Sequence, residues 1–203
     1  VNAAGVIALY RAGLTRLSED AADFSAVGIA ASFVGLLLFN DLWFYAWHRL
    51  LHTPWWFKHV HSVHHKSVDV NPFSSYSFHP VEAFLFGAWF VPAAMIVPLY
   101  LPVLGALQVV GLVNNVMSHL GYELLPRWWL RLPLLRWMNT STFHNLHHSQ
   151  WCGNYGLTSR VWDRLWGTEL PGYAAAFRGE GTATLAAATT QETQETQERA
   201  AAP

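Results

Sequence analysis

Three short histidine-rich segments constrain the fold of this 203-residue chain more than any other feature. They lie at residues 48–52, 61–65 and 144–148. On a helix, residues three or four positions apart share a face, so each segment projects its imidazoles together. The residues concerned are His48, His52, His61, His64, His65, His144, His147 and His148. They exceed the four ligands of one tetrahedral zinc ion. We therefore predict a dinuclear metal site with open positions for oxygen or substrate.

The composition indicates a membrane protein that forms one domain. Hydrophobic residues make up 52% of the chain and charged residues 12%, about half the charged share that is usual in soluble domains. Eleven tryptophans and seven tyrosines suit the interface between bilayer and water. The net charge of −1 gives no reason to expect nucleic acid binding. The single cysteine rules out an intrachain disulfide and a cysteine-based metal site.

Apolar stretches predict the membrane helices. Residues 24–47 form a run long enough to cross a bilayer, which takes about 20 residues. Two further runs, 81–98 and 102–120, predict a tight helical hairpin that crosses the bilayer and returns. Residues 1–23 are interpreted as an amino-terminal segment that starts with the end of a helix, a truncated membrane helix being one interpretation. The expected fold is an all-α integral membrane protein with three to four membrane helices and a histidine-rich helical cap.

The predicted hairpin brings two further histidines to the same membrane face. His79 lies just before the outgoing helix and His119 near the end of the returning one, so both are predicted metal ligands. Basic residues concentrate on this face, whereas the turn at 98–102 carries no charge. By the positive-inside rule, the histidine face is cytoplasmic. Residues 24–173 are then the membrane domain, and 174–203, rich in Ala, Thr, Gln and Glu, are expected to be a disordered tail.

Four polar residues are candidates for orienting the ligating imidazoles: Asp41, Glu82, Asn115 and Asp163. Asp41 lies on the histidine face of an apolar helix, so we interpret it as a carboxylate that orients an imidazole, the alternative being an aspartate that lies at the membrane interface without such a role. For Glu82, a role at a helix end fits equally well, and for Asp163 so does pairing with a nearby arginine. Asn115 has three possible roles: orienting a ligand, binding water or packing between helices. His59 lies on the opposite side of its helix and is not a predicted ligand.

The histidine segments also carry a family resemblance. HRLLH, HSVHH and HNLHH resemble the three histidine boxes of the fatty acid hydroxylase/sterol desaturase superfamily of integral membrane di-iron oxygenases. The flanking phrases DLWFYAWHR at 41–49, FHPVE at 78–82 and GNYGLTSRVWDRLWGT at 153–168 fit as well. The resemblance implies two iron ions held by the eight box histidines, with His119 completing the shell and His79 as a further ligand. It also implies electrons from a separate protein, since nothing in the chain matches a fused haem domain.

Residues and resemblance together predict an O₂-dependent oxidoreductase that hydroxylates, or desaturates, a C–H bond of a lipid such as a sterol or fatty acyl chain. Imidazole ligands suit zinc as well as iron, so zinc in a purified sample is compatible with this prediction. One alternative is a membrane metal-binding or transport protein, but a transporter places its ligands near the bilayer midplane. Another is a zinc-dependent membrane hydrolase, which needs only three or four ligands and a carboxylate base. The lipid, the electron donor and the oligomeric state stay open.

Overall fold

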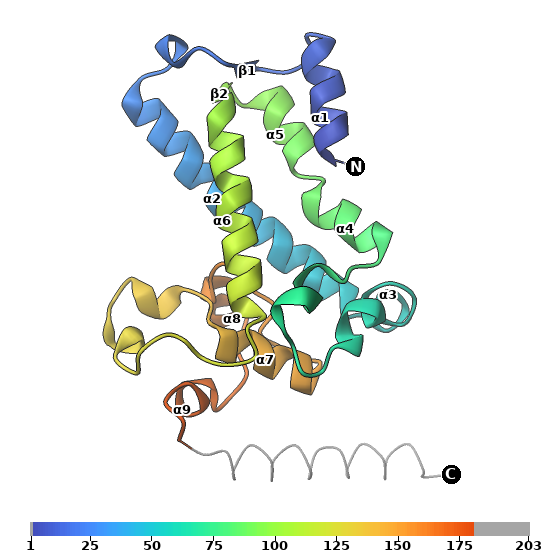
Figure 1. Cartoon of the computed structure of the whole chain (residues 1–203), viewed down its shortest axis with the longest axis vertical. Coiled ribbons are helices and arrows are strands. Elements are labelled where there is room, and N and C mark those ends of the chain that lie inside the picture. The colour runs from blue at the N-terminus through green and yellow to red at the C-terminus, as the bar shows by residue number, and fades with distance from the viewer. Residues whose placement is uncertain (1, 181–203) are drawn as a thin grey trace.

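The computed structural model describes residues 2–180, which form a helical protein with long helices at one end and a layer of short helices at the other (Figure 1). The α-helices are α1 (Asn2–Arg11), α2 (Ala26–Leu51), α3 (Pro54–His59), α4 (Pro80–Gly87), α5 (Phe90–Ile96), α6 (Leu101–Ser118), α7 (Ser141–Gln150), α8 (Val161–Leu165) and α9 (Tyr173–Phe177). The 3₁₀ helices are η1 (Ala21–Asp23), η2 (His61–Lys66), η3 (Pro72–Tyr76), η4 (Trp129–Arg131) and η5 (Leu135–Trp137). Two short strands, β1 (Leu17–Ser18) and β2 (Leu99–Tyr100), complete the described elements.

Two helices, α2 and α6, are long and apolar enough to cross a membrane. α2 begins after Ser25, whose hydroxyl oxygen accepts a hydrogen bond from the backbone N–H of Gly28 at 3.0 Å. Only 17% of the most apolar part of α2, and 28% of that of α6, is buried inside the protein. Most of their apolar side chains therefore face outward, as expected for contact with lipid rather than for the core of a water-soluble domain.

The predicted outgoing membrane helix over 81–98 consists of two shorter helices, α4 and α5. Pro92 lies in the first turn of α5. Proline has no N–H, so a continuous helix would lack the bond from residue 92 to the carbonyl of Ala88, and the proline ring would crowd that carbonyl. The helix is interrupted at this point, which the apolar pattern alone did not predict.

The amino-terminal segment packs against the far ends of the long helices. β1 pairs in parallel with β2, with Leu17 opposite Leu99, and α1 packs on α5 (Figure 1). The main apolar cluster lies beside this pair, where α2, α5 and α6 meet. Its buried members are Leu36, Trp89, Phe90, Ala93, Leu99, Val103, Leu104 and Leu107. The segment before α2 is thus part of the described fold.

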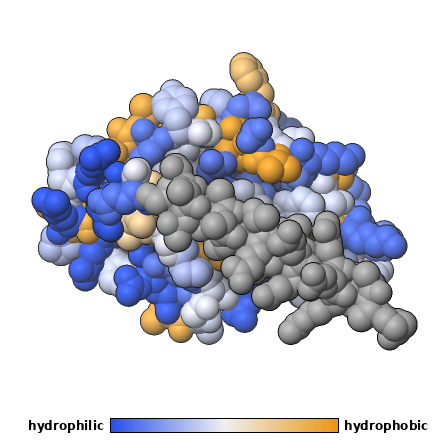
Figure 2. All heavy atoms as spheres, turned by 90° about the horizontal axis from the view of Figure 1, so that it is seen from below, coloured by the Kyte–Doolittle hydropathy of each residue, from blue (hydrophilic) through white to orange (hydrophobic). Residues whose placement is uncertain are grey.

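The opposite ends of α2 and α6 carry the cap of short helices that includes η2, α7, α8 and α9 (Figure 1). A second apolar cluster lies here and joins Phe143 of α7 to Tyr173 and Phe177 of α9. The described fold therefore continues past the predicted boundary at residue 173, because Phe177 is only 4% exposed. The rest of the predicted tail, from residue 181, lies outside the described residues. Seen from this end, the surface carries many hydrophilic side chains (Figure 2).

Candidate metal centre

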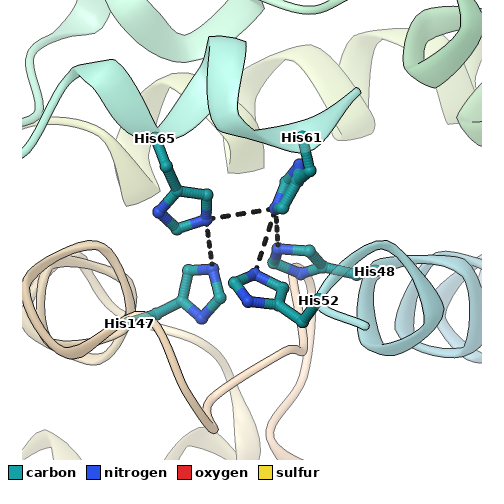
Figure 3. A group of neighbouring side chains, drawn as sticks. All are labelled: His48, His52, His61, His65 and His147. Atoms are coloured by element: carbon teal, nitrogen blue, oxygen red, sulfur yellow. Dashed lines mark hydrogen bonds between the residues drawn. The ribbon is translucent and has the colours of Figure 1, made fainter. Parts of the chain in front are cut away.

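The structure brings nine histidines together in the cap, in two adjacent groups. Group one consists of His48, His52, His61, His65 and His147. Group two consists of His64, His119, His144 and His148. Within each group, one ring nitrogen of every residue lies within 4.8 Å of those of the others. Figure 3 shows the five rings of group one pointing toward one another from α2, η2 and α7.

Two of the three histidine segments serve both groups. In every segment, the two histidines four positions apart belong to the same group, whereas the prediction had all the imidazoles of a segment on one face. The third histidine of η2, His64, belongs to group two. The third histidine of α7, His147, belongs to group one. The groups touch, since the rings of His65 and His148 stack with their centroids 4.4 Å apart. Residues from distant parts of the chain thus form one continuous cluster of imidazoles.

Backbone carbonyl groups orient five of these rings. Three of the carbonyls belong to alternate residues of one loop: His52 Nδ1 donates to Trp151 O (3.0 Å), His147 Nδ1 to Gly153 O (2.7 Å) and His48 Nδ1 to Tyr155 O (2.7 Å). The other two contacts are from His119 Nδ1 to Asn115 O (2.8 Å) and from His148 Nδ1 to Ser67 O (3.0 Å). A carbonyl oxygen only accepts hydrogen bonds, so each of these Nδ1 atoms carries the ring hydrogen. The Nε2 atom of each neutral ring then presents a bare lone pair to the centre of its group.

The Nε2 atoms of group one make more close contacts with one another than hydrogen bonds can explain. His61 Nε2 lies 3.1 Å from the Nε2 atoms of His48, His52 and His65, and His65 Nε2 lies 3.1 Å from that of His147. A ring nitrogen carries at most one hydrogen, and the Nε2 atoms of His48, His52 and His147 carry none. At most two of these four contacts are therefore hydrogen bonds. A cation at the centre would use every lone pair as a ligand, so the residues fit a metal ion.

Burial keeps the clustered imidazoles neutral. Loss of hydration is the main cause that lowers the pKa of His61 to about 3 and the pKa values of His119 and His147 to about 4. Neighbouring imidazoles lower these values further for His61 and His147. The neutral ring is the form that binds a metal ion, so these histidines are ready to bind at neutral pH.

The loop that supplies three of the carbonyls is held by two fully buried side chains, Asn154 and Asp163. Asn154 Nδ2 donates to the carbonyl of Phe143 at 3.0 Å, and its Oδ1 accepts from the backbone N–H of Leu170 at 2.7 Å. Asp163 accepts hydrogen bonds from two successive backbone N–H groups of the loop, at 2.8 and 2.7 Å. The loop is therefore fixed to the rest of the cap, and through its carbonyls it fixes three rings of group one.

The phrase at 153–168 was part of the family resemblance, but no contact between this loop and the histidines was predicted. Its backbone is unusual, since Trp151 and Asn154 have φ values of 59° and 51°, a region that costs energy for residues other than glycine. Gly153 has a φ of 65°, and a Cβ there would lie 2.5 Å from the carbonyl oxygen of Thr168, so only glycine fits. The available signal was the Gly153-Asn154 pair, because these residue types adopt positive φ most readily.

Two of the four predicted orienting residues contact ligating histidines. Glu82 lies where the prediction placed it, because His61 Nδ1 lies 2.7 Å from Glu82 Oε1 and both side chains are fully buried. Asn115 orients His119, but with its backbone carbonyl. The amide of Asn115 instead donates to the carbonyl of Ser75 at 2.6 Å, which is the packing role among the alternatives considered.

The other two orienting residues act differently from their predictions. Asp41 contacts no imidazole in the described structure, and its carboxylate accepts from the backbone N–H groups of Thr158 and Ser159 at 3.1 Å. Seven residues separate Asp41 from His48, about 10 Å along the helix, which is too far for direct contact. Asp163 holds backbone N–H groups rather than an imidazole or an arginine. Arg160 pairs with Glu169 instead, at 2.8 Å.

His79 is the one predicted ligand that the structure does not bring to either group. It is the N-cap of α4, where its Nδ1 accepts a hydrogen bond from the backbone N–H of Val81 at 3.2 Å. The hairpin topology places the start of the helix near the cap but does not determine where the ring points. The predicted ligand role of His79 is therefore corrected to helix capping. His59 is exposed beside Trp55 and lies outside both groups, as predicted.

A cavity of about 310 Å³ adjoins both groups between α2, α4 and α6. Its aromatic walls touch the histidines. Phe44 stacks on Phe86 with ring centroids 4.3 Å apart, and both rings contact His48. Phe78 lies 4.9 Å from the ring of His64. These aromatic side chains therefore form the wall between the cavity and the histidine groups.

Comparison with known proteins gives concordant matches. The family model described as fatty acid hydroxylase matches residues 33–168. Methylsterol monooxygenase 1 of Gallus gallus is 30% identical over 141 residues, which cover 70% of this chain and 47% of that protein. Lathosterol oxidase of Rattus norvegicus is 31% identical over 171 residues, or 83% of this chain and 55% of that protein. The chain thus spans about half the length of the curated relatives that it matches. No solved structure gives a significant match.

Proposed function

The chain belongs to the fatty acid hydroxylase family, and from this premise we propose that it is a membrane enzyme that uses O₂ to oxidise a C–H bond of a lipid. The observation that carries the proposal is the convergence of nine neutral imidazoles beside an aromatic cavity. The proposed reaction is hydroxylation, and the alternative is desaturation. Both are considered because both begin with removal of a hydrogen from carbon.

Two iron ions are the proposed cofactors, one in each histidine group. Group one offers five ring nitrogens and group two offers four. When bound, the iron ions would supply the reduction of O₂ and the attack on an unactivated C–H bond, which no acid-base side chain performs. The protein's own contribution is to orient the imidazoles through fixed Nδ1 contacts and to line the approach with aromatic side chains. Zinc would suit the same nitrogens.

The proposed substrate is a lipid that enters from the bilayer. We propose a sterol in preference to a fatty acyl chain. Two relatives are named for sterols, methylsterol monooxygenase 1 and lathosterol oxidase. The cavity lies between α2, α4 and α6, of which α2 and α6 are apolar enough to cross a membrane. In this arrangement α4 and α5 together make a third crossing. A lipid would reach the histidine groups without leaving its apolar surroundings.

We further propose that the cap faces the cytoplasm and receives electrons there from a separate protein. The cap presents a hydrophilic surface (Figure 2). Exposed basic residues lie on the cap or next to it: Arg49, Lys58, Lys66, Arg127, Arg131, Arg136 and Arg164. This distribution follows the positive-inside rule.

The two alternatives from other functional classes fit the site less well. A metal transporter would hold its ligands near the middle of the membrane helices, whereas these histidines lie at the cap ends of α2 and α6 and in the cap itself. A zinc hydrolase would need one metal ion with three or four ligands and an open position, whereas here nine imidazoles form two groups.

The test compares whole-lipid mass spectra of cells that express the wild type, His147→Ala or His59→Ala. His147 belongs to group one, whereas His59 is an exposed histidine outside both groups and serves as the matched control. We expect a lipid that gains one oxygen, or loses two hydrogens, in the wild type and the control but not in His147→Ala. Wild-type product formation by His147→Ala would refute the site, and cleavage of a lipid with uptake of water in the absence of O₂ would favour the hydrolase.

A further inference from the structure

We infer that Asn40 and Gln108 form a polar subsite in the cavity, which binds a neutral hydroxyl or carbonyl group of the lipid substrate. This inference rests on the proposed function and adds a determinant of specificity to it. Both residues line the cavity that adjoins the histidine groups. Asn40 belongs to α2 and Gln108 to α6, the two helices that are apolar enough to cross a membrane.

Both amides lie in the middle parts of their helices, next to the apolar crossing. Asn40 follows the buried Leu36 by one helical turn, and Gln108 follows the buried Leu104 by one turn. A polar side chain at the depth of a membrane helix is costly unless it is paired, and it usually has a function. These positions therefore call for a hydrogen-bonding partner.

The described part of the chain supplies no such partner. Neither amide side chain makes a hydrogen bond within residues 2–180, in contrast to other polar groups of the same region. The Asn115 amide, on the same cavity wall, donates to the carbonyl of Ser75, and the Trp43 indole donates to the carbonyl of Leu85. Asn40 is half-buried and Gln108 is exposed at the mouth of the cavity, so each amide has both a donor and an acceptor available to a molecule that enters it.

Two stripes of residues connect the amides with the metal centre. On α2, Asn40, Phe44 and His48 follow at intervals of four, so they lie on one face. The eight residues from Asn40 to His48 correspond to about 12 Å along the helix. On α6, Gln108 precedes His119 by eleven residues, which correspond to about 16 Å. Along the helices, the two amides therefore lie about 12 to 16 Å from the metal centre, with Phe44 in between on α2.

This geometry defines a class of substrate. The lipid would be elongated and apolar, and its polar group would lie on the order of 12 Å from the carbon that is oxidised. Among the described residues that line the cavity, none is charged, so a neutral hydroxyl or carbonyl fits better than a phosphate or a carboxylate. Gly111, between Gln108 and Asn115 on α6, leaves room for the body of the lipid, since a Cβ there would meet no atom within 4 Å.

The experiment measures which lipids the full-length, metal-loaded protein retains in detergent micelles, by mass spectrometry. The probes are two pairs that differ by one hydroxyl group: cholesterol with cholest-5-ene, and 1-octadecanol with octadecane. The variants are Asn40→Leu and Gln108→Leu, which remove the amides at nearly constant volume. Asn114→Leu is the matched control, because Asn114 is an amide of the same helix that lines a different cavity.

We expect the wild type and Asn114→Leu to prefer the hydroxylated member of at least one pair by about tenfold, the usual effect of one or two net hydrogen bonds. Asn40→Leu and Gln108→Leu should lose this preference while they keep their metal. Equal retention within both pairs by the wild type, or an unchanged preference in both variants, would overturn the subsite and leave the proposed function standing. Retention of no probe by the wild type would overturn the subsite together with the lipid substrate.

Discussion

Replacement of Asp163 by asparagine should weaken metal binding at group one while leaving group two intact. Asp163 touches no histidine. It holds the backbone N–H groups of Tyr155 and Gly156, and the carbonyls of Tyr155 and Gly153 in the same loop accept from the Nδ1 atoms of His48 and His147. A change of this one side chain therefore acts on two ligands of group one through the loop.

The size of the effect follows from the hydrogen bonds. Asp163 Oδ1 accepts from the N–H of Tyr155 and from the hydroxyl of Thr168, and Oδ2 accepts from the N–H of Gly156 at 2.7 Å. The least costly asparagine places its NH₂ at the Oδ2 position, where it leaves one buried N–H without an acceptor. Such a loss costs about 1–3 kcal/mol of the free energy of unfolding. In a domain of this size, it lowers the melting temperature by roughly 2–12 °C.

The metal affinity of group one should fall by about 10–100-fold, the usual effect of removing a group that positions metal ligands. The assay loads the purified protein with Fe²⁺ without O₂ and measures bound metal against a chelator series, well below the melting temperature. We expect one of the two metal ions to leave at lower chelator concentration. Asp69→Asn, at an exposed aspartate, is the control. Equal retention of both ions by Asp163→Asn and the wild type would refute the role of the loop.

Three further predictions concern other parts of the site. Glu82→Gln replaces the carboxyl group that contacts His61 Nδ1 by an amide, so chelator competition should show about tenfold weaker metal binding; unchanged affinity would contradict this. Gly111→Phe should fill the cavity and abolish lipid oxidation with the metal content unchanged, whereas Gly105→Phe, on the same helix outside the cavity and equally open around its Cβ, should retain activity. Acid should destabilise the metal-free protein. Burial lowers the pKa of the clustered histidines outside α2, for example to about 4 for His119 and His147, so the unfolded chain binds more protons below about pH 6.5. Burial raises the pKa of Asp163, which opposes this trend, but the histidines outnumber this one group. The melting temperature should therefore fall as the pH falls from about 6.5 toward 4, and a constant melting temperature over this range would contradict the assignment.

The sequence pointed to the eight box histidines and to His119 as members of one cluster, and the structure brings these nine residues together. Helical periodicity predicted that each segment would present its imidazoles on one face, and the structure keeps only the histidines four positions apart in one group. The apolar runs predicted α2 and α6 as candidate membrane helices. These features are local, because they depend on residue type and on a spacing of one helical turn. Glu82 was also a candidate, since it is a carboxylate at the start of a helix next to a histidine.

Only the tertiary structure decided the contacts between distant segments. His64 and His147 each belong to a different group from the other histidines of their segments. His79 caps a helix, and the Asp41 carboxylate accepts hydrogen bonds from the backbone at 158–159. The tertiary structure also placed three backbone carbonyls against the rings of group one. Every residue has the same carbonyl, so no residue type marks which carbonyl accepts a hydrogen bond. That choice depends on where the loop lies relative to α2 and α7, and long-range packing determines it.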